Sequence, residues 1–164
     1  MTRVLKGYVR AMDMVNMIIG WILALLLGIM TILITWQVFA RFVVGNSLTF
    51  SEEIARFLMI WITLLGAAYA MRQGTLIAVE LLPDYLTGLA QKTIRILAHL
   101  ISLVFYLILI IFGWEIAQSV SFQRAPATAI SMFWPMISVC VGGTFLFLNT
   151  VVVMIEEAIG KEEK

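Results

Sequence analysis

The run MVNMIIGWILALLLGIMTILITWQVFA, residues 14–40, decides the fold class because it contains no charged side chain. A helix needs about 20 mostly apolar residues to cross the hydrocarbon core of a bilayer. Three further charge-free runs follow, at residues 57–71, 96–114 and 125–155. Hydrophobic residues make up 62% of the 164-residue chain, and charged residues only 13%. We therefore predict an all-α membrane protein with four transmembrane helices.

The predicted organisation is one membrane domain, residues 1–164, with transmembrane helices at about 14–42, 51–72, 93–116 and 130–156. The first run exceeds the roughly 7–15 residues of a signal-peptide core, so we expect a retained span. Residues 1–13 are basic and amphipathic, which suits either a short helix on an anionic membrane surface or a basic tail that sets topology. Residues 75–83 are expected to form an interfacial segment, and residues 157–164 a charged tail.

The distribution of basic residues predicts the topology. In bacterial membrane proteins, loops on the cytoplasmic side carry an excess of Lys and Arg. If the amino terminus is cytoplasmic, the outer side has only Arg41, Arg124 and the boundary residue Arg56, while the inner side collects Arg3, Lys6, Arg10, Arg72, Lys92, Arg95, Lys161 and Lys164. We therefore expect both termini in the cytoplasm and the start of the second helix on the outer side.

The start of the second helix carries the most unusual polar cluster of the chain. Thr49 and Glu52 have the spacing of a capping box, in which each side chain bonds a free backbone N–H at the helix start. Glu52 and Glu53 would also meet the positive end of the helix dipole, and Arg56 is placed to pair with either. The cluster serves either to cap and anchor the helix or to make a polar contact with a partner protein.

Small residues recur along three of the runs and predict faces where helices pack closely. They are Gly20, Ala24 and Gly28 in the first run, Gly66, Ala67 and Ala70 in the second, and Gly142 and Gly143 in the fourth. We expect these residues to let neighbouring backbones approach.

Several classes of function lack the residues that they need. The chain has one histidine, His99, with no second ligand at metal-binding spacing, and no nucleotide-binding or nucleophile motif. The net charge of +1, with scattered basic residues, gives no reason to expect nucleic acid as a partner. We predict no enzymatic activity and no cofactor. Three hypotheses remain: an accessory membrane subunit, a self-contained small transporter, and the membrane anchor of a redox enzyme.

One run of features in order, over residues 37–80, resembles a known family. The features are Gln37, Val38, Arg41 and Phe42, a Gly-Asn turn, Ser51-Glu52-Glu53-Ile54-Ala55-Arg56, Trp61, Gly66-Ala67-Ala68, Arg72, Gly74 and Val79-Glu80. This order resembles the small membrane subunit, the DctQ type, of tripartite ATP-independent periplasmic (TRAP) transporters. The four-span layout and the length agree over nearly the whole chain.

The resemblance implies a role in a three-part importer of the bacterial cytoplasmic membrane. A periplasmic binding protein would capture an organic acid, of the C4-dicarboxylate or sialic acid class. A large membrane subunit of the DctM type would import the acid with sodium ions, which bind in that subunit. The small subunit would be a scaffold among membrane lipids. As candidates for its partner interface we name Arg41, Glu52, Glu53, Arg56, Trp61, Gly66 and Ala70.

Overall fold

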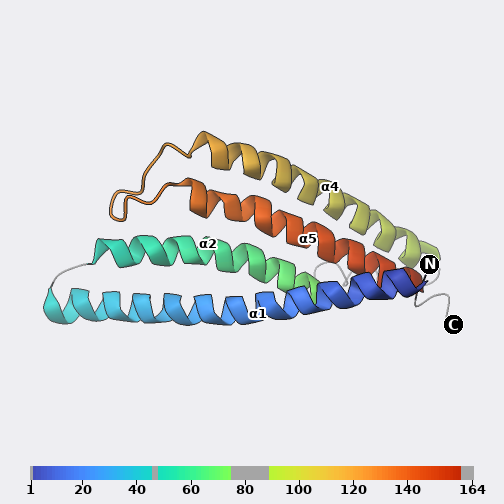
Figure 1. The fold of residues 1–164 in the computed structure, drawn as a ribbon, viewed down its shortest axis with the longest axis horizontal. Coiled ribbons are helices and arrows are strands. Elements are labelled where there is room, and N and C mark those ends of the chain that lie inside the picture. The colour runs from blue at the N-terminus through green and yellow to red at the C-terminus, as the bar shows by residue number, and fades with distance from the viewer. Residues whose placement is uncertain (1, 46–47, 75–88, 160–164) are drawn as a thin grey trace.

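Four long helices make up nearly all of the part of the protein that the structure describes. The computed structural model describes residues 2–45, 48–74 and 89–159 (Figure 1). Its elements are α1 (Thr2–Phe39), a π-helix η1 (Ala40–Val44), α2 (Thr49–Arg72), α4 (Leu89–Ser119) and α5 (Phe133–Ile159). The spans long and apolar enough to cross a membrane are Gly7–Val43, Thr49–Arg72, Thr93–Ser119 and Phe133–Glu156. The predicted fold class, all-α with four membrane helices, is confirmed.

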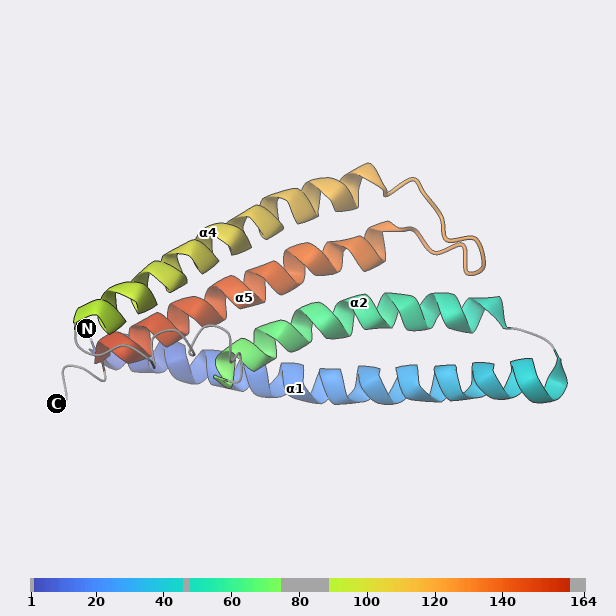
Figure 2. The same cartoon turned by 180° about the vertical axis from the view of Figure 1, so that it is seen from behind.

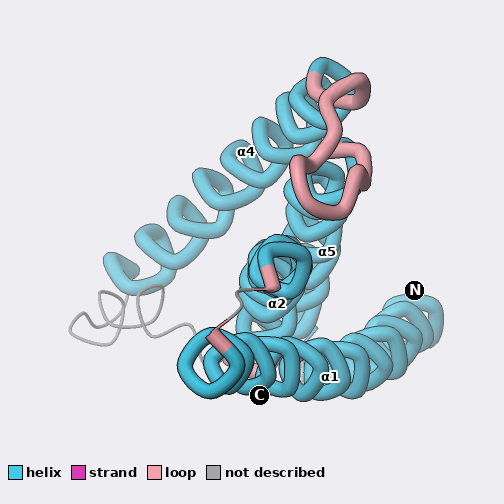
Figure 3. The backbone as a smooth tube through the Cα atoms, turned by 90° about the vertical axis from the view of Figure 1, so that its left-hand side faces the viewer, coloured by secondary structure: helices cyan, strands magenta, loops and turns pink. Residues whose placement is uncertain are grey.

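The helices form an open row and not a closed bundle. Helix α4 contacts α5, α5 contacts α2, and α2 contacts α1. Helix α1 also contacts α5, at the level of Asn16, and over the described ranges α4 contacts neither α1 nor α2. The end-on view places α2 and α5 in the middle and α1 and α4 at the two edges (Figure 3). Seen from behind, the α1–α2 and α4–α5 hairpins fan out from the end that carries both termini, and at the other end the loop before α5 bonds the start of α2 (Figure 2). Among the residues that the structure describes, each edge helix therefore has one face without an intrachain neighbour.

The first helix is longer than the predicted span. Residues 2–13 are continuous with the apolar run in a single helix of 38 residues, so they form no separate surface helix. Just after this segment, Asp13 is bonded to α2 and Asn16 to α5. The predicted interfacial segment 75–83 lies outside the described residues. Helix α5 continues to Ile159, which takes in the first residues of the predicted charged tail.

Two glycines end the helices of the first hairpin. Gly45 has φ +72° and donates its backbone N–H to the carbonyl of Ala40, which closes η1. Gly74 follows α2 with φ +66° and bonds back to the carbonyl of Met71. Both backbones are left-handed, a conformation that glycine adopts without steric cost. Gly45 thus lies at the Gly-Asn turn, and the predicted end of the second helix at residue 72 is confirmed.

The small residues of α5 pack as expected, but those of α1 mostly do not. A Cβ on Gly142 would lie 2.7 Å from the Cβ of Leu64 in α2, and one on Gly143 would lie 3.2 Å from the Cβ of Leu109 in α4. Gly20 packs on the ring of Tyr69, whereas a Cβ on Gly28 would meet nothing within 4 Å. The small-residue face predicted for α1 is thus used inside the described chain only at its inner end.

Candidate functional site

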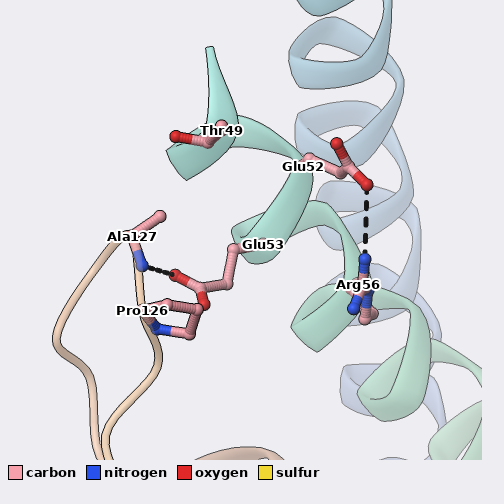
Figure 4. A pocket seen from close by; sticks show the side chains of 6 residues that line it. All are labelled: Thr49, Glu52, Glu53, Arg56, Pro126 and Ala127. Carbon is pink, nitrogen blue, oxygen red and sulfur yellow. Dashed lines mark hydrogen bonds and ion pairs between the residues drawn. The ribbon is translucent and has the colours of Figure 1, made fainter. Parts of the chain in front are cut away.

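The two adjacent glutamates at the start of α2 point to different neighbours. The carboxylate of Glu53 accepts hydrogen bonds from the backbone N–H of Thr128 (2.7 Å), the hydroxyl of Thr128 (2.8 Å) and the backbone N–H of Ala127 (3.2 Å). Figure 4 shows Glu53 directed to the loop between α4 and α5, while Glu52 points away from it toward Arg56. Glu53 therefore fastens this loop to α2.

Glu52 links α2 to α1 by weaker bonds. Its carboxylate accepts from Nη2 of Arg56 at 3.3 Å, the predicted ion pair one helical turn apart, and from Nε2 of Gln37 in α1 at 3.2 Å. The side chains of Arg56 and Glu52 are 65% and 53% exposed, so in water such a pair adds little stability. The bond to Gln37 is the one that joins two helices, because it links the outer ends of α1 and α2.

The predicted capping box is wrong. Leu48 precedes the first residue of α2, and no side chain caps this helix end. The hydroxyl of Ser51 instead donates to the carbonyl of Leu48 at 3.0 Å. Glu52 does not bond back to the helix start because Gln37 and Arg56 take up its carboxylate.

The loop that Glu53 holds is ordered by its own hydrogen bonds. The backbone N–H of Ala125 donates to the carbonyl of Ile130 at 2.9 Å, and the hydroxyl of Ser131 donates to the carbonyl of Ser121 at 2.6 Å. Ala129 has φ +56°, which turns the chain back toward α5. A shallow pocket of about 200 Å³ lies where the loop meets α2, and its lining consists of Thr49, Glu52, Glu53, Arg56, Pro126 and Ala127.

At the opposite end of the row, Arg72 joins three helices. Its guanidinium holds Glu156 of α5 with two parallel bonds of 2.7 Å, and it contacts the carboxylate of Asp13 in α1 at 2.6 Å. The Arg72 side chain is only 14% exposed. Two-point pairing of arginine with a carboxylate combines strength with a fixed geometry. We call Asp13, Arg72 and Glu156 the inner clamp.

A buried amide pair lies close to the inner clamp. Asn16 and Asn149 bond each other reciprocally, with N–O distances of 2.7 and 2.9 Å, and Asn149 also donates to the carbonyl of Ala68 at 2.7 Å. Asn16 donates in addition to the carbonyl of Met12 in its own helix. Both asparagines are buried. The nitrogen and the oxygen of both amides therefore have hydrogen-bond partners. The amide pair is a second place, besides the inner clamp, where polar bonds join α1, α2 and α5.

Comparison with known proteins identifies the family. Residues 30–160 match the profile of the family described as tripartite ATP-independent periplasmic transporters, DctQ component. The chain belongs to this family. The matched region includes the whole of α2, α4 and α5 and the loop between α4 and α5, but not Asp13 and Asn16.

Two curated proteins are similar to this DctQ subunit. The sialic acid TRAP transporter small permease protein SiaQ of Vibrio cholerae is 27% identical over 121 residues, which are 74% of this chain and 70% of that protein. A putative TRAP transporter small permease protein of Haemophilus influenzae is 27% identical over 89 residues, 54% of this chain and 55% of that protein. The chain is thus a small permease subunit of a TRAP transporter and a multi-pass membrane protein.

Some candidate interface residues of this DctQ subunit are bonded within the chain, and the others are exposed or half-buried. Glu53 and Trp61 are engaged within the chain, Trp61 through its indole N–H, which donates to the carbonyl of Trp134 at 3.1 Å. Glu52 and Arg56 are mostly exposed, and Arg41 is exposed in η1. Ala70 is half-buried, and so is Gly66, on which a Cβ would meet nothing within 4 Å. The structure thus brings Glu52, Glu53 and Arg56 together and leaves the other candidates spread along the hairpin of α1 and α2.

Two features of the site were not predicted from the sequence: the inner clamp and the Asn16–Asn149 pair. Arg72 was interpreted only as a basic residue at the inner boundary. Asparagines inside apolar runs were a usable signal, because an amide in hydrocarbon needs a partner on a neighbouring helix.

His99, the one histidine, is buried in α4. Over the described residues, no three His, Cys, Asp or Glu side chains lie together in a way that could hold a metal ion.

Proposed function

We propose that this DctQ subunit is the scaffold of a sodium-coupled, binding-protein-dependent TRAP importer of organic acids. The observation that carries the proposal is the open helix row. The strong polar bonds of the row, at the inner clamp and at Glu53, join groups of this chain to one another. Within the described ranges, the outward faces of α1 and α4 have no intrachain neighbour. Such a subunit offers fixed surfaces to other proteins and to lipid.

The proposed partners are a large membrane subunit of the DctM type and a periplasmic substrate-binding protein. Substrate and sodium ions would bind in the large subunit, so this chain needs neither a cofactor nor a reaction of its own. The relative from Vibrio cholerae has sialic acid in its name, which supports the sialic acid class, with C4-dicarboxylates as the other class. Exposed Arg41, Glu52 and Arg56 are the polar groups most available for contact with a partner.

The proposed location is the bacterial cytoplasmic membrane, with both termini in the cytoplasm. The excess of basic residues near the termini supports this orientation. In this orientation the inner clamp faces the cytoplasm, and the loop held by Glu53 faces the periplasm. The periplasmic binding protein would then approach the side that carries Glu52, Glu53 and Arg56.

Reconstitution with and without partners tests the function. We expect the chain to co-purify with its large subunit in mild detergent. We also expect uptake of organic acid into proteoliposomes only when both membrane subunits and the binding protein are present with a sodium gradient. Uptake by this chain alone would overturn the scaffold proposal in favour of a self-contained transporter. Bound haem in the absorption spectrum of the purified chain would favour a redox anchor.

A further inference from the structure

The loop between α4 and α5 presents three hydrogen-bond donors to one oxygen of Glu53. The backbone N–H of Ala127, the backbone N–H of Thr128 and the hydroxyl of Thr128 all donate to Oε2, at 3.2, 2.7 and 2.8 Å. Successive backbone N–H groups that point to one spot form a concave site for an anion. Hydrogen bonds to an ionised carboxylate are roughly twice as strong as bonds between neutral groups. The contact therefore favours the charged form of Glu53.

These bonds are the main attachment of the loop to the first hairpin. Among the residues that the structure describes, every hydrogen bond between residues 121–130 and α1 or α2 goes to Glu53. Within this stretch only Ala125 is buried and Thr128 half-buried. Ile130 lines a groove with α2 but is 37% exposed. Apolar burial thus adds little to the hold that Glu53 has on the loop.

The same loop contains one strained residue. Ala129 has φ +56° and is the one non-glycine residue with positive φ in the described part of the chain. This left-handed conformation is unfavourable for a residue with a Cβ. The N–H of Ala129 donates to the carbonyl of Ala125 at 2.9 Å, and its carbonyl accepts from Arg124 at 3.1 Å. Because strain persists only where the surroundings hold a residue in place, it favours opening of the turn once the loop is released.

No basic side chain of the described residues forms an ion pair with Glu53. Glu52 points away from the loop and pairs with Arg56 (Figure 4). Arg124 is directed to a carbonyl of its own loop. The other charged side chains near this end of the row are Arg41 of η1 and Glu115 of α4. The charge of Glu53 is therefore balanced by the three donors of the loop, and the shallow pocket beside it gives protons from the medium access.

We propose that Glu53 is a charge-dependent latch, which holds the strained loop when ionised and releases the loop when protonated. The released state binds one proton more than the latched state, so acid favours release and neutral pH favours the latched loop. In the proposed orientation the loop faces the periplasm, and acidification of the outer medium is the trigger. The latch itself depends on contacts within this chain, and only the compartment of the trigger rests on the proposed function.

The amide resonance of Thr128 reports the latch directly. The chain, isotope-labelled at its threonine amides, is placed in lipid nanodiscs and followed by NMR from about pH 7.5 to about pH 4, where glutamate side chains ordinarily begin to bind protons. We expect the resonance to move on acidification to the position that it has in Glu53→Gln, which should keep that position at every pH. Glu52→Gln is the matched control, because it removes the same charge from a neighbour that does not bond the loop. This control should titrate as the wild type does.

A second comparison tests the strain. Ala129→Gly removes the steric cost of the left-handed backbone. The ratio of latched to released loop should rise by about fivefold, which moves the midpoint of the transition by about 0.7 pH unit toward acid. Ala127→Gly is the matched control, since it adds a glycine to the same loop at a residue without positive φ. Its midpoint should not move toward acid.

Each other result overturns the proposal. A Thr128 resonance that stays in place down to about pH 4, or a wild-type position in Glu53→Gln, would show that charge does not hold the loop. Movement with pH in Glu53→Gln would assign the titration to another group, and loss of the titration in Glu52→Gln would assign it to the total charge of the helix end. Equal midpoints for the two glycine variants would exclude the strain. If Glu53→Gln does not fold, the wild type, Glu52→Gln and Ala129→Gly still decide, since the latch requires a transition in all three.

Discussion

Replacing Asn149 with leucine should destabilise the isolated chain by about 2 kcal/mol. The change removes three hydrogen bonds between helices, two with Asn16 and one with the carbonyl of Ala68, and such bonds average about 0.6 kcal/mol each in membrane proteins. Leucine keeps the γ-branched shape of asparagine but is larger, so no cavity contributes to the loss, and any overpacking adds to it. Leucine at both asparagine positions should recover part of the loss, because no buried amide is then left without a partner.

The assay is equilibrium unfolding of the purified chain in mild detergent, with denaturing detergent as titrant and helix content by circular dichroism as readout. Thr150→Val is the matched control, because Thr150 is equally buried but its hydroxyl bonds only Leu146 in its own helix. We expect the control to cost about 0.6 kcal/mol or less. If Asn149→Leu costs no more than Thr150→Val, the amide pair does not hold the three helices together. A double-mutant cycle over both asparagines with no coupling energy would lead to the same conclusion.

Three further predictions each compare two substitutions that should differ in effect. Glu53→Gln should speed amide hydrogen exchange in the loop between α4 and α5, whereas Glu52→Gln should not, because only Glu53 bonds that loop; equal exchange in both variants would contradict the assigned contacts. Gly142→Ala should cost about 1–3 kcal/mol by overpacking, while Gly66→Ala should be tolerated in the isolated chain, since only the first Cβ meets a neighbour; thermal unfolding compares them. Arg72→Met should lower the unfolding midpoint more than Arg72→Lys, which keeps a charge at the inner clamp, and equal midpoints would show that this charge is not needed.

The helices were predictable from the sequence because the signal for each is local. A charge-free run of sufficient length and the glycines that follow two of the helices lie next to the residues whose structure they determine. The contacts of the glutamates were not predictable in this way. Glu53 bonds a residue 75 positions later, and Glu52 bonds one 15 positions earlier. These distant partners compete with the local capping box, and no spacing rule within α2 could have revealed them.

The same reasoning separates the two glycine-rich faces. Gly142 and Gly28 look alike in sequence, since each lies in an apolar run with small neighbours. Only Gly142 packs inside the chain, because α5 lies in the middle of the row and α1 lies at its edge. The position of a helix in the row depends on which helices touch, and such contacts are not encoded in a single run. A small-residue face thus predicts close packing without telling whether the neighbour belongs to the same chain.

Helix α2 connects the polar network, and this position explains how a thin row of helices can act as a scaffold. Glu52 bonds α1, Glu53 bonds the loop before α5, the carbonyl of Ala68 bonds α5, and Arg72 bonds both α1 and α5. The bonds of Glu52 and Glu53 lie at the outer end of α2, and those of Ala68 and Arg72 lie close to its inner end. Bonds at these two levels resist bending and sliding of the neighbouring helices. The edge faces of α1 and α4 then keep their relative orientation without any contact of their own. In the function proposed above, such a fixed surface would support a partner subunit, and a row held through α2 provides it with few residues.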